Sequence, residues 1–89
     1  MRWDYKFHEL ALKELRRLDQ PVQRQIFKYL DKHVCQSPNP LAYAKPLLGR
    51  YFGLVRFRVG AYRLICRPLE RELLIMVTEV GNRRDIYEE

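Results

Sequence analysis

The chain has 89 residues, a length that supports one hydrophobic core, so residues 1–89 are expected to form a single domain. Its hydrophobic content of 47% is enough for a packed core, and no apolar run reaches the length of a membrane span, so we expect a folded cytoplasmic protein with no membrane partner. Seventeen Lys and Arg against eleven Asp and Glu give a net charge of +6, which favours a polyanionic partner.

The N-terminal part of the chain predicts one strand and two helices. Residues 2–7 alternate between aromatic and polar side chains, as a strand with one buried face does. Leucines then recur at helical spacing over about residues 8–18, and a second apolar stripe follows an Asp-Gln-Pro break and runs to about residue 35. Because the break is short, we expect the two helices to form an antiparallel hairpin.

The C-terminal half predicts three strands. Two prolines within residues 37–40 end the helical region, and a loop follows. Residues 54–59 and 62–67 alternate on either side of a Gly-Ala pair, which suits a two-residue turn of type II′. Pro68 and the charged residues after it indicate another turn, and residues 73–80 form an apolar run typical of a central strand.

These elements predict an α+β domain of order βααβββ. Strands that follow helices indicate a helical hairpin packed on one face of a mainly antiparallel, four-stranded sheet. The other face then meets solvent or a ligand. Gly81 and Asn82 are expected to end the last strand and release a short C-terminal tail.

Positive charge is concentrated in the middle of the chain. Seven basic residues and no carboxylate lie between Asp31 and Glu70, whereas the rest of the chain has ten basic and eleven acidic residues. Pairing the two strands around the Gly-Ala turn puts Arg58 opposite Arg63, and alternation then places four arginines on the face away from the core. These are Arg56, Arg58, Arg63 and Arg67.

A row of arginines on one face favours an anionic ligand. Like charges in register repel one another unless an anion neutralises them, and guanidinium groups suit phosphate because they offer paired, planar donors. Arg83, Arg84 and Tyr87 follow the last strand and are expected to reach the same face, where an aromatic ring beside arginines suits single-stranded RNA. The alternative is that the basic residues only protect an exposed strand from aggregation.

The other candidate groups are less informative. Cys35 and Cys66 lie in no disulfide or metal-ligand pattern, so both are expected to be reduced and structural, and no metal site is predicted. His8 and His33 are expected to be structural. Glu79 interrupts an apolar strand and is either part of a buried ion pair or an exposed proton acceptor on the basic face.

Four segments of the chain follow, in order, the pattern of the RelE/ParE toxin superfamily of bacterial toxin–antitoxin systems. They are residues 11–18 (ALKELRRL), 45–49 (KPLLG), 56–64 (RFRVGAYRL) and 80–87 (VGNRRDIY). Over nearly its whole length the chain resembles this superfamily, and in particular its RelE branch of messenger-RNA endonucleases. The resemblance implies a βααβββ domain, a RelB-like antitoxin in a hetero-oligomer, and cleavage of messenger RNA on the ribosome without metal or cofactor.

The resemblance also implies the site residues. Arg63 matches the family's phosphate-binding arginine, Arg83 matches the arginine after the Val-Gly turn, and Tyr87 matches the tyrosine that stacks on a base. Arg56 and Leu54 depart from the family, which has lysines there. The predicted catalytic set is therefore Arg56, Arg63, Arg83 and Tyr87, and the predicted RNA-binding set is Lys45, Arg50, Arg58, Arg67 and Arg84.

The implied reaction is attack of a ribose 2′-hydroxyl on the adjacent phosphate, which leaves a 2′,3′-cyclic phosphate and a 5′-hydroxyl. An arginine does not deprotonate in proteins, so the general base stays open between Lys45, Glu79 and ribosomal RNA. The alternative is that the rate rests mainly on orientation of the substrate. Two other functions stay open as well. One is a ParE-like toxin that inhibits DNA gyrase without cutting nucleic acid, and the other is a non-catalytic RNA-binding module.

Overall fold

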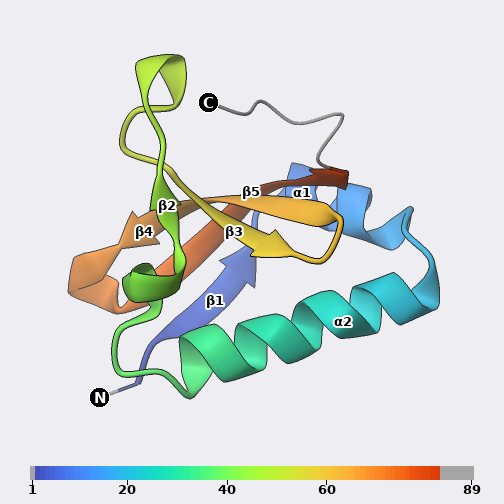
Figure 1. Ribbon diagram of the computed structural model, residues 1–89, viewed down its shortest axis with the longest axis horizontal. Coiled ribbons are helices and arrows are strands. Elements are labelled where there is room, and N and C mark those ends of the chain that lie inside the picture. The colour runs from blue at the N-terminus through green and yellow to red at the C-terminus, as the bar shows by residue number, and fades with distance from the viewer. Residues whose placement is uncertain (1, 83–89) are drawn as a thin grey trace.

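Two helices cover one face of a five-stranded sheet in the computed structural model, which describes residues 2–82 (Figure 1). The helices are α1 (Glu9–Arg16) and α2 (Gln20–Leu30), and the strands are β1 (Asp4–Phe7), β2 (Lys45–Pro46), β3 (Val55–Val59), β4 (Tyr62–Leu69) and β5 (Leu74–Asn82). The strands lie in the order β1-β5-β4-β3-β2, with β1 parallel to β5 and every other pair antiparallel.

The predicted α+β class and the mainly antiparallel sheet are confirmed, but the sheet has five strands where four were predicted. The additional strand, β2, has two residues and pairs Lys45 with Arg56 and Pro46 with Val55. A strand of this length is too short to show alternation, so the sequence predicts only a loop there.

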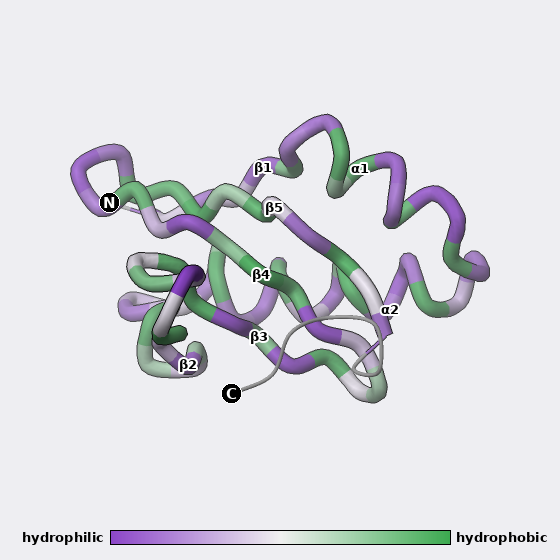
Figure 2. Tube along the Cα trace, turned by 90° about the horizontal axis from the view of Figure 1, so that it is seen from above, coloured by the Kyte–Doolittle hydropathy of each residue, from purple (hydrophilic) through white to green (hydrophobic). Residues whose placement is uncertain are grey.

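The core lies between the helices and the sheet. Ala11 and Leu15 of α1, and Ile26 and Leu30 of α2, are fully or almost fully buried. On the sheet side the buried residues of this core are Phe57, Val59, Leu64, Cys66, Ile75, Val77 and Val80. The strands therefore have one apolar face toward the helices, and polar and apolar residues alternate along β3 (Figure 2). No helix among the described residues is long and apolar enough to cross a bilayer.

The hairpin of β3 and β4 has the predicted register. Val59 pairs with Tyr62, Arg58 with Arg63, and Phe57 with Leu64. Gly60 has a φ of 59°, the left-handed conformation that glycine adopts at little cost and that the first loop residue of this turn requires.

Two predicted boundaries are wrong. Pro68 was predicted to mark a turn but lies within β4, opposite Ile75 of β5. Its missing N–H is tolerated because β3 pairs with β4 only as far as Cys66, so no strand of the described residues lies on that side of β4 at Pro68. The charged residues after Pro68 do form the predicted turn, a 3-10 turn over Glu70–Glu72 that ends at Leu73, whose φ is 50°. Strand β5 then continues through Gly81 and Asn82, because both still pair with β4.

The two histidines have the structural roles expected of them. His8 precedes α1, and its Nδ1 accepts a hydrogen bond of 3.3 Å from the backbone N–H of Leu10, which caps the helix. The chain continues beyond α2 as a π-helical turn, Asp31–Cys35. Within it, the His33 ring stacks on the Tyr29 ring at a centroid distance of 4.1 Å.

Candidate nucleic-acid interface

The face of the sheet opposite the helices, called here the outer face, gathers the predicted basic residues of the hairpin. Arg58 and Arg63 are cross-strand partners, and Lys45 is the partner of Arg56. Arg56 and Arg58 are two residues apart on β3, so they lie on the same side of the sheet. These four residues, Lys45, Arg56, Arg58 and Arg63, form one cationic cluster over three adjacent strands.

The members of this cationic cluster differ in exposure. Lys45 and Arg58 are exposed and Arg56 is half-buried, whereas Arg63 has only 1% of its surface exposed. The expectation that all four hairpin arginines lie exposed on an open face is therefore wrong for Arg63. Arg63 lies on β4, an interior strand, with Arg58 of β3 on one side and Gly81 of β5 on the other.

The segment between β2 and β3 contributes an apolar patch to the outer face. Leu47 and Ile65 are buried together, and Tyr51 and Leu54 pack against them. Part of the outer face is therefore buried under this segment, which the alternation of the strands did not indicate. Arg67 is exposed and follows Ile65, the partner of Arg56, by two residues on β4, so it lies on the outer face as a diagonal neighbour of Arg56.

Arg50 extends the positive charge toward β5. It belongs to a short 3-10 turn, Gly49–Tyr51, and its guanidinium lies 5.6 Å from the centroid of the Tyr51 ring. Burial and the charge of Glu14 raise the pKa of Glu79, and the charge of Arg50 opposes them.

Glu79 reaches the outer face because β5 is irregular. Cys66 pairs with Val77 and Ile65 pairs with Glu79, so Thr78 is an extra residue that forms a β-bulge. Its hydroxyl donates a hydrogen bond of 3.0 Å to the carbonyl of Ile65. Because of the bulge, Val80 points into the core and Glu79 lies on the same face as Ile65. Of the two positions predicted for Glu79, the structure therefore supports the one on the basic face.

The carboxyl group of Glu79 favours its protonated form more than an exposed glutamate does. Burial is the main cause of its raised pKa, and the negative charge of Glu14 adds to it, while Arg50 opposes both. Glu14 and Glu79 line a cavity of about 340 Å³ at the end of β5, together with Arg17, Leu18, Tyr62, Val80, Gly81 and Asn82. A half-buried carboxyl group with a raised pKa at the rim of a cavity suits proton transfer.

Three predicted site residues, Arg83, Arg84 and Tyr87, lie outside the described residues. The structure therefore brings together Lys45, Arg56, Arg58 and Arg63, places Arg67 diagonal to Arg56 on the same face, and places Arg50 in the turn between β2 and β3. The sequence did not single out Glu14, because a glutamate on an amphipathic helix is usually a solvated residue.

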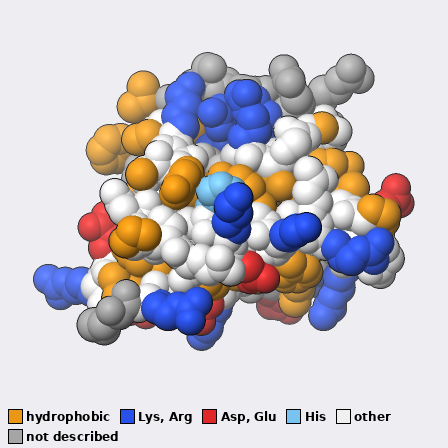
Figure 3. Space-filling model, turned by 60° about the horizontal axis from the view of Figure 1, so that its bottom comes forward, with side chains coloured by type: hydrophobic (Ala, Val, Ile, Leu, Met, Phe, Trp, Pro, Cys, Tyr) orange, Lys and Arg blue, Asp and Glu red, His pale blue; other side chains and the backbone are white. Residues whose placement is uncertain are grey.

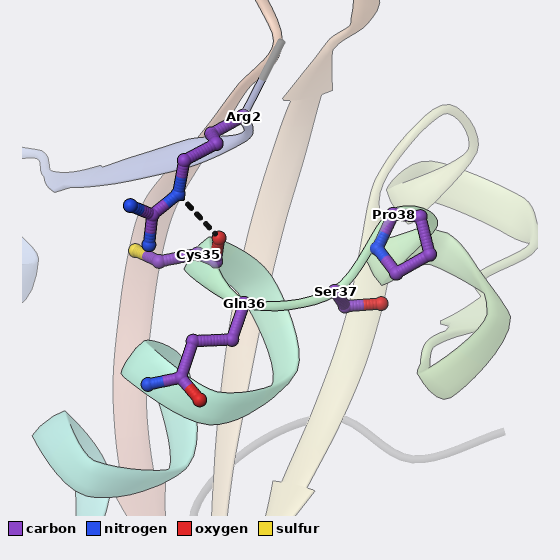
Figure 4. Close-up of a pocket in the computed structure, with 5 residues that line it drawn as sticks. All are labelled: Arg2, Cys35, Gln36, Ser37 and Pro38. Carbon is purple, nitrogen blue, oxygen red and sulfur yellow. Dashed lines mark hydrogen bonds between the residues drawn. The ribbon is translucent and has the colours of Figure 1, made fainter.

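Cys35 and Cys66 are free thiols in the structure. Burial raises the pKa of Cys66 far above its usual range, and burial together with the charges of Asp4 and Asp31 raises the pKa of Cys35. Cys35 also lines a pocket of about 390 Å³, where its carbonyl accepts a hydrogen bond of 3.2 Å from Nε of Arg2 (Figure 4). Within residues 2–82, no group of three or more His, Cys, Asp and Glu side chains is arranged to hold a metal ion.

Comparisons with known proteins agree with this architecture. The model of the family described as the ParE toxin of type II toxin–antitoxin system, parDE, matches residues 5–87. A RelE-like toxin protein of Escherichia coli is 36% identical over 90 residues, which cover 98% of this chain and 92% of that protein.

Two solved structures are similar in fold. The isolated RelE toxin of E. coli has a TM-score of 0.68 and 27% identity, and the match covers 92% of this chain and 84% of that one. A chain of the toxin–antitoxin complex RelBE2 of Mycobacterium tuberculosis has a TM-score of 0.83 and 24% identity, with 96% and 95% of the two chains covered. At 24% identity, the likeness to the RelBE2 chain shows a shared fold.

Proposed function

Because the chain belongs to the RelE/ParE superfamily, as a RelE-like toxin of a type II toxin–antitoxin system, we propose that it is a ribosome-dependent endoribonuclease that cleaves messenger RNA. The observation that supports this most is the cationic cluster of Lys45, Arg56, Arg58 and Arg63 on the outer face. Such a cluster attracts the sugar-phosphate backbone and stabilises the extra negative charge that develops on a phosphate under attack.

In the proposed reaction, the ribose 2′-oxygen attacks the adjacent phosphorus and the bond to the 5′-oxygen breaks. The products are a 2′,3′-cyclic phosphate and a 5′-hydroxyl. We assign Arg63 to the pentacoordinate phosphate from the resemblance and from its place opposite Arg58 on the outer face, and because only 1% of its surface is exposed, the substrate must displace the groups that cover it. Arg56 and Arg58 hold the flanking phosphates, and Lys45 and Arg50 widen the binding surface.

Glu79 is our candidate for the group that accepts the 2′-hydroxyl proton. It lies on β5 two residues before Gly81, the cross-strand partner of Arg63, so it is a diagonal neighbour of Arg63 on the outer face. Its raised pKa brings it closer to neutral pH, where a general base is most effective. Arginines stay protonated and cannot take this role.

The predicted roles of the C-terminal residues stay part of this proposal. Arg83 and Arg84 would add donors to the phosphates, and Tyr87 would stack on a base next to the cleaved bond. These assignments rest on the resemblance and on the fact that the three residues follow β5 in the sequence.

We further propose that a RelB-like antitoxin binds this toxin in the cytoplasm and forms a hetero-oligomer with it. RelBE complexes are among the similar structures, and one of them is the intact RelBE complex of E. coli, with 25% identity and a TM-score of 0.67. Leu48 and Phe52, in the segment between β2 and β3, have 62% and 80% of their surfaces exposed and could bury apolar area against a partner.

The test is cleavage of messenger RNA by the purified protein on translating ribosomes, read by primer extension. Wild type should cut at discrete codon positions, and Arg63→Ala should cut at least roughly 100-fold more slowly. Arg71→Ala removes an exposed arginine outside the cationic cluster and should cut normally. Intact messenger at every protein concentration would reject the proposal.

One finding favours a second candidate, a toxin that inhibits DNA gyrase, because the matching family model is that of the ParE toxin. A supercoiling assay with purified gyrase separates the two functions. Arrest of supercoiling by a protein that leaves messenger RNA intact on ribosomes would establish the second candidate in place of the first.

A further inference from the structure

A second basic surface lies on a different part of the molecule, between α2 and the turn that joins β3 to β4. A groove of about 360 Å³ runs there, lined by Gln25, Lys28, Tyr29, Lys32, Arg58, Val59 and Gly60. Figure 3 turns the bottom of the molecule, where α2 lies in Figure 1, toward the viewer, and Lys and Arg side chains are spread over that face with fewer Asp and Glu among them. We call this feature the α2 groove.

Three cations line the α2 groove. Lys28 lies on α2 and Lys32 on the π-helical turn that continues it, and both are exposed and line the groove. Arg58 faces them from β3. None of the described residues that line the groove is an Asp or a Glu.

Only one carboxylate adjoins these lysines in the sequence, and it does not line the groove. Helix α2 contains no carboxylate, and between its first residue and Leu69 the chain has only one, Asp31. The Oδ1 atom of Asp31 accepts a hydrogen bond of 2.9 Å from the hydroxyl of Tyr5 on β1. That carboxylate is therefore engaged with the opposite edge strand of the sheet.

The groove is open beside an unpaired strand edge. Strand β2 pairs with Val55 and Arg56 only, so the edge of β3 at Arg58 has no neighbouring strand among the described residues. Arg58 is exposed, belongs to the outer face by its register, and also lines the groove. A chain of phosphates held on the outer face can thus pass over Arg58 and enter the groove.

The lining suits a sugar-phosphate strand better than a peptide. A segment that folds on binding needs several apolar side chains to bury, but Val59 is already buried, so Tyr29, which is half-buried, is the one apolar side chain among the described lining residues that is still open. A phosphate backbone needs only spaced cations, and these are present.

We propose that the α2 groove is a second binding site for the RNA backbone, at which Lys28, Lys32 and Arg58 hold phosphates away from the bond that is cut. This inference rests on the proposed function only in taking RNA as the ligand. It requires no cleavage, so binding tests it independently.

The experiment measures binding of a fluorescein-labelled, 20-nucleotide single-stranded RNA by fluorescence anisotropy between 50 and 200 mM salt. The variant Lys28→Gln/Lys32→Gln should bind about tenfold more weakly at low salt, and its slope of log affinity against log salt should fall in magnitude by about 1.4. The matched control, Lys6→Gln/Lys13→Gln, removes the same charge from exposed positions on β1 and α1 and should change both quantities by less than half as much.

The outcomes separate this inference from the proposed function. A protein that cuts messenger RNA but binds the RNA equally well with and without the two groove lysines would overturn the inference alone. A protein that never cuts RNA, but loses affinity on substitution of Lys28 and Lys32 and not of Lys6 and Lys13, would support it. Loss of binding to an acidic peptide of the antitoxin, with RNA binding unchanged, would assign the groove to that peptide and also overturn it.

A second measurement avoids any effect of substitution on folding. The wild-type protein is acetylated with and without saturating RNA, and the modified lysines are identified by mass spectrometry. RNA should protect Lys28 and Lys32 at least several-fold more than Lys6 and Lys13. Equal protection at all four lysines would contradict a site in the groove.

Discussion

The backbone N–H of Val80 donates a hydrogen bond of 2.9 Å to the side-chain Oε1 of Glu14, 66 residues earlier in the chain. Strand β1 accompanies β5 only as far as Val77, whose carbonyl accepts a hydrogen bond from the N–H of His8. Beyond Val77, β1 no longer pairs with β5, and the Glu14 carboxylate accepts the hydrogen bond from Val80 that a neighbouring strand would otherwise accept. Helix α1 thereby protects a strand edge that would otherwise be open.

Removing this contact should destabilise the fold. Glu14→Ala leaves the partly buried N–H of Val80 without its acceptor and should lower the free energy of unfolding by about 1 to 2 kcal/mol in urea denaturation. Glu14→Gln keeps an acceptor oxygen and should lose less than half as much. Equal losses in both variants would show that the charge of Glu14, and not its hydrogen bond, is the stabilising feature.

The raised pKa of Glu79 predicts a pH dependence of stability. Because the folded state binds the proton of Glu79 more tightly than the unfolded state, this contribution is complete below the unfolded pKa, about 4.3, and is lost as the pH rises through the folded pKa. Glu79→Gln should therefore be more stable than wild type at neutral pH, and the difference should vanish at low pH. Denaturation between pH 4 and 8 measures it, and a constant difference would contradict the assignment.

Gly60 should tolerate substitution poorly for two separable reasons. An added Cβ would meet a left-handed backbone conformation and would lie 2.9 Å from Nε2 of Gln25 on α2. Gly49 has a similar φ of 65° with open space around it, so Gly49→Ala measures the cost of conformation alone, about 1 kcal/mol. Thermal denaturation should show a larger loss for Gly60→Ala, and equal losses would mean that the Gln25 side chain moves aside freely.

Arg63 and Arg58 should respond differently to lysine. Arg63 is buried on an interior strand, where the planar guanidinium holds its donors in fixed directions, so Arg63→Lys should slow RNA cleavage by on the order of 100-fold. Arg58 is exposed, and Arg58→Lys keeps its charge, so only a few-fold loss is expected. The comparison needs single-turnover rates on ribosomes, and similar losses for both variants would argue against a special role of Arg63.

Neither thiol should react readily in the native protein. The thiolate is the reactive form, and burial raises the pKa of both Cys66 and Cys35. Alkylation by iodoacetamide at pH 8 should label Cys66 only after denaturation and Cys35 more slowly than free cysteine. Rapid labelling of Cys66 in the native state would mean that the core opens far more often than its packing indicates.

The register of the hairpin was predictable from the sequence because local rules determine it. A glycine that can adopt positive φ sets the turn, and alternation then assigns Phe57 and Leu64 to the core and Arg58 to the other face. The four arginines of the outer face follow from that register alone. Their shared face is therefore a consequence of backbone geometry and needs no knowledge of tertiary contacts.

Exposure within the outer face was not predictable in the same way. Whether Arg63 is open or buried depends on which strand is interior and on how the segment between β2 and β3 folds, and both are properties of the whole sheet. Strand β2 was missed because two residues carry no periodicity. Pro68 was misread because proline is allowed in a strand where the adjacent edge is free, a condition that depends on the length of β3.

The bulge at Thr78 lets β5 absorb one surplus amino acid without reversing its two sides. In an unbroken pleat that amino acid would turn Glu79 toward the hydrocarbon interior and Val80 toward water. A chain shortened by deletion of Thr78 would keep the same side chains on the same sides, as a plain strand. Loss of this one residue is therefore compatible with an unchanged arrangement of the Glu79 carboxylate and the arginines of the outer face.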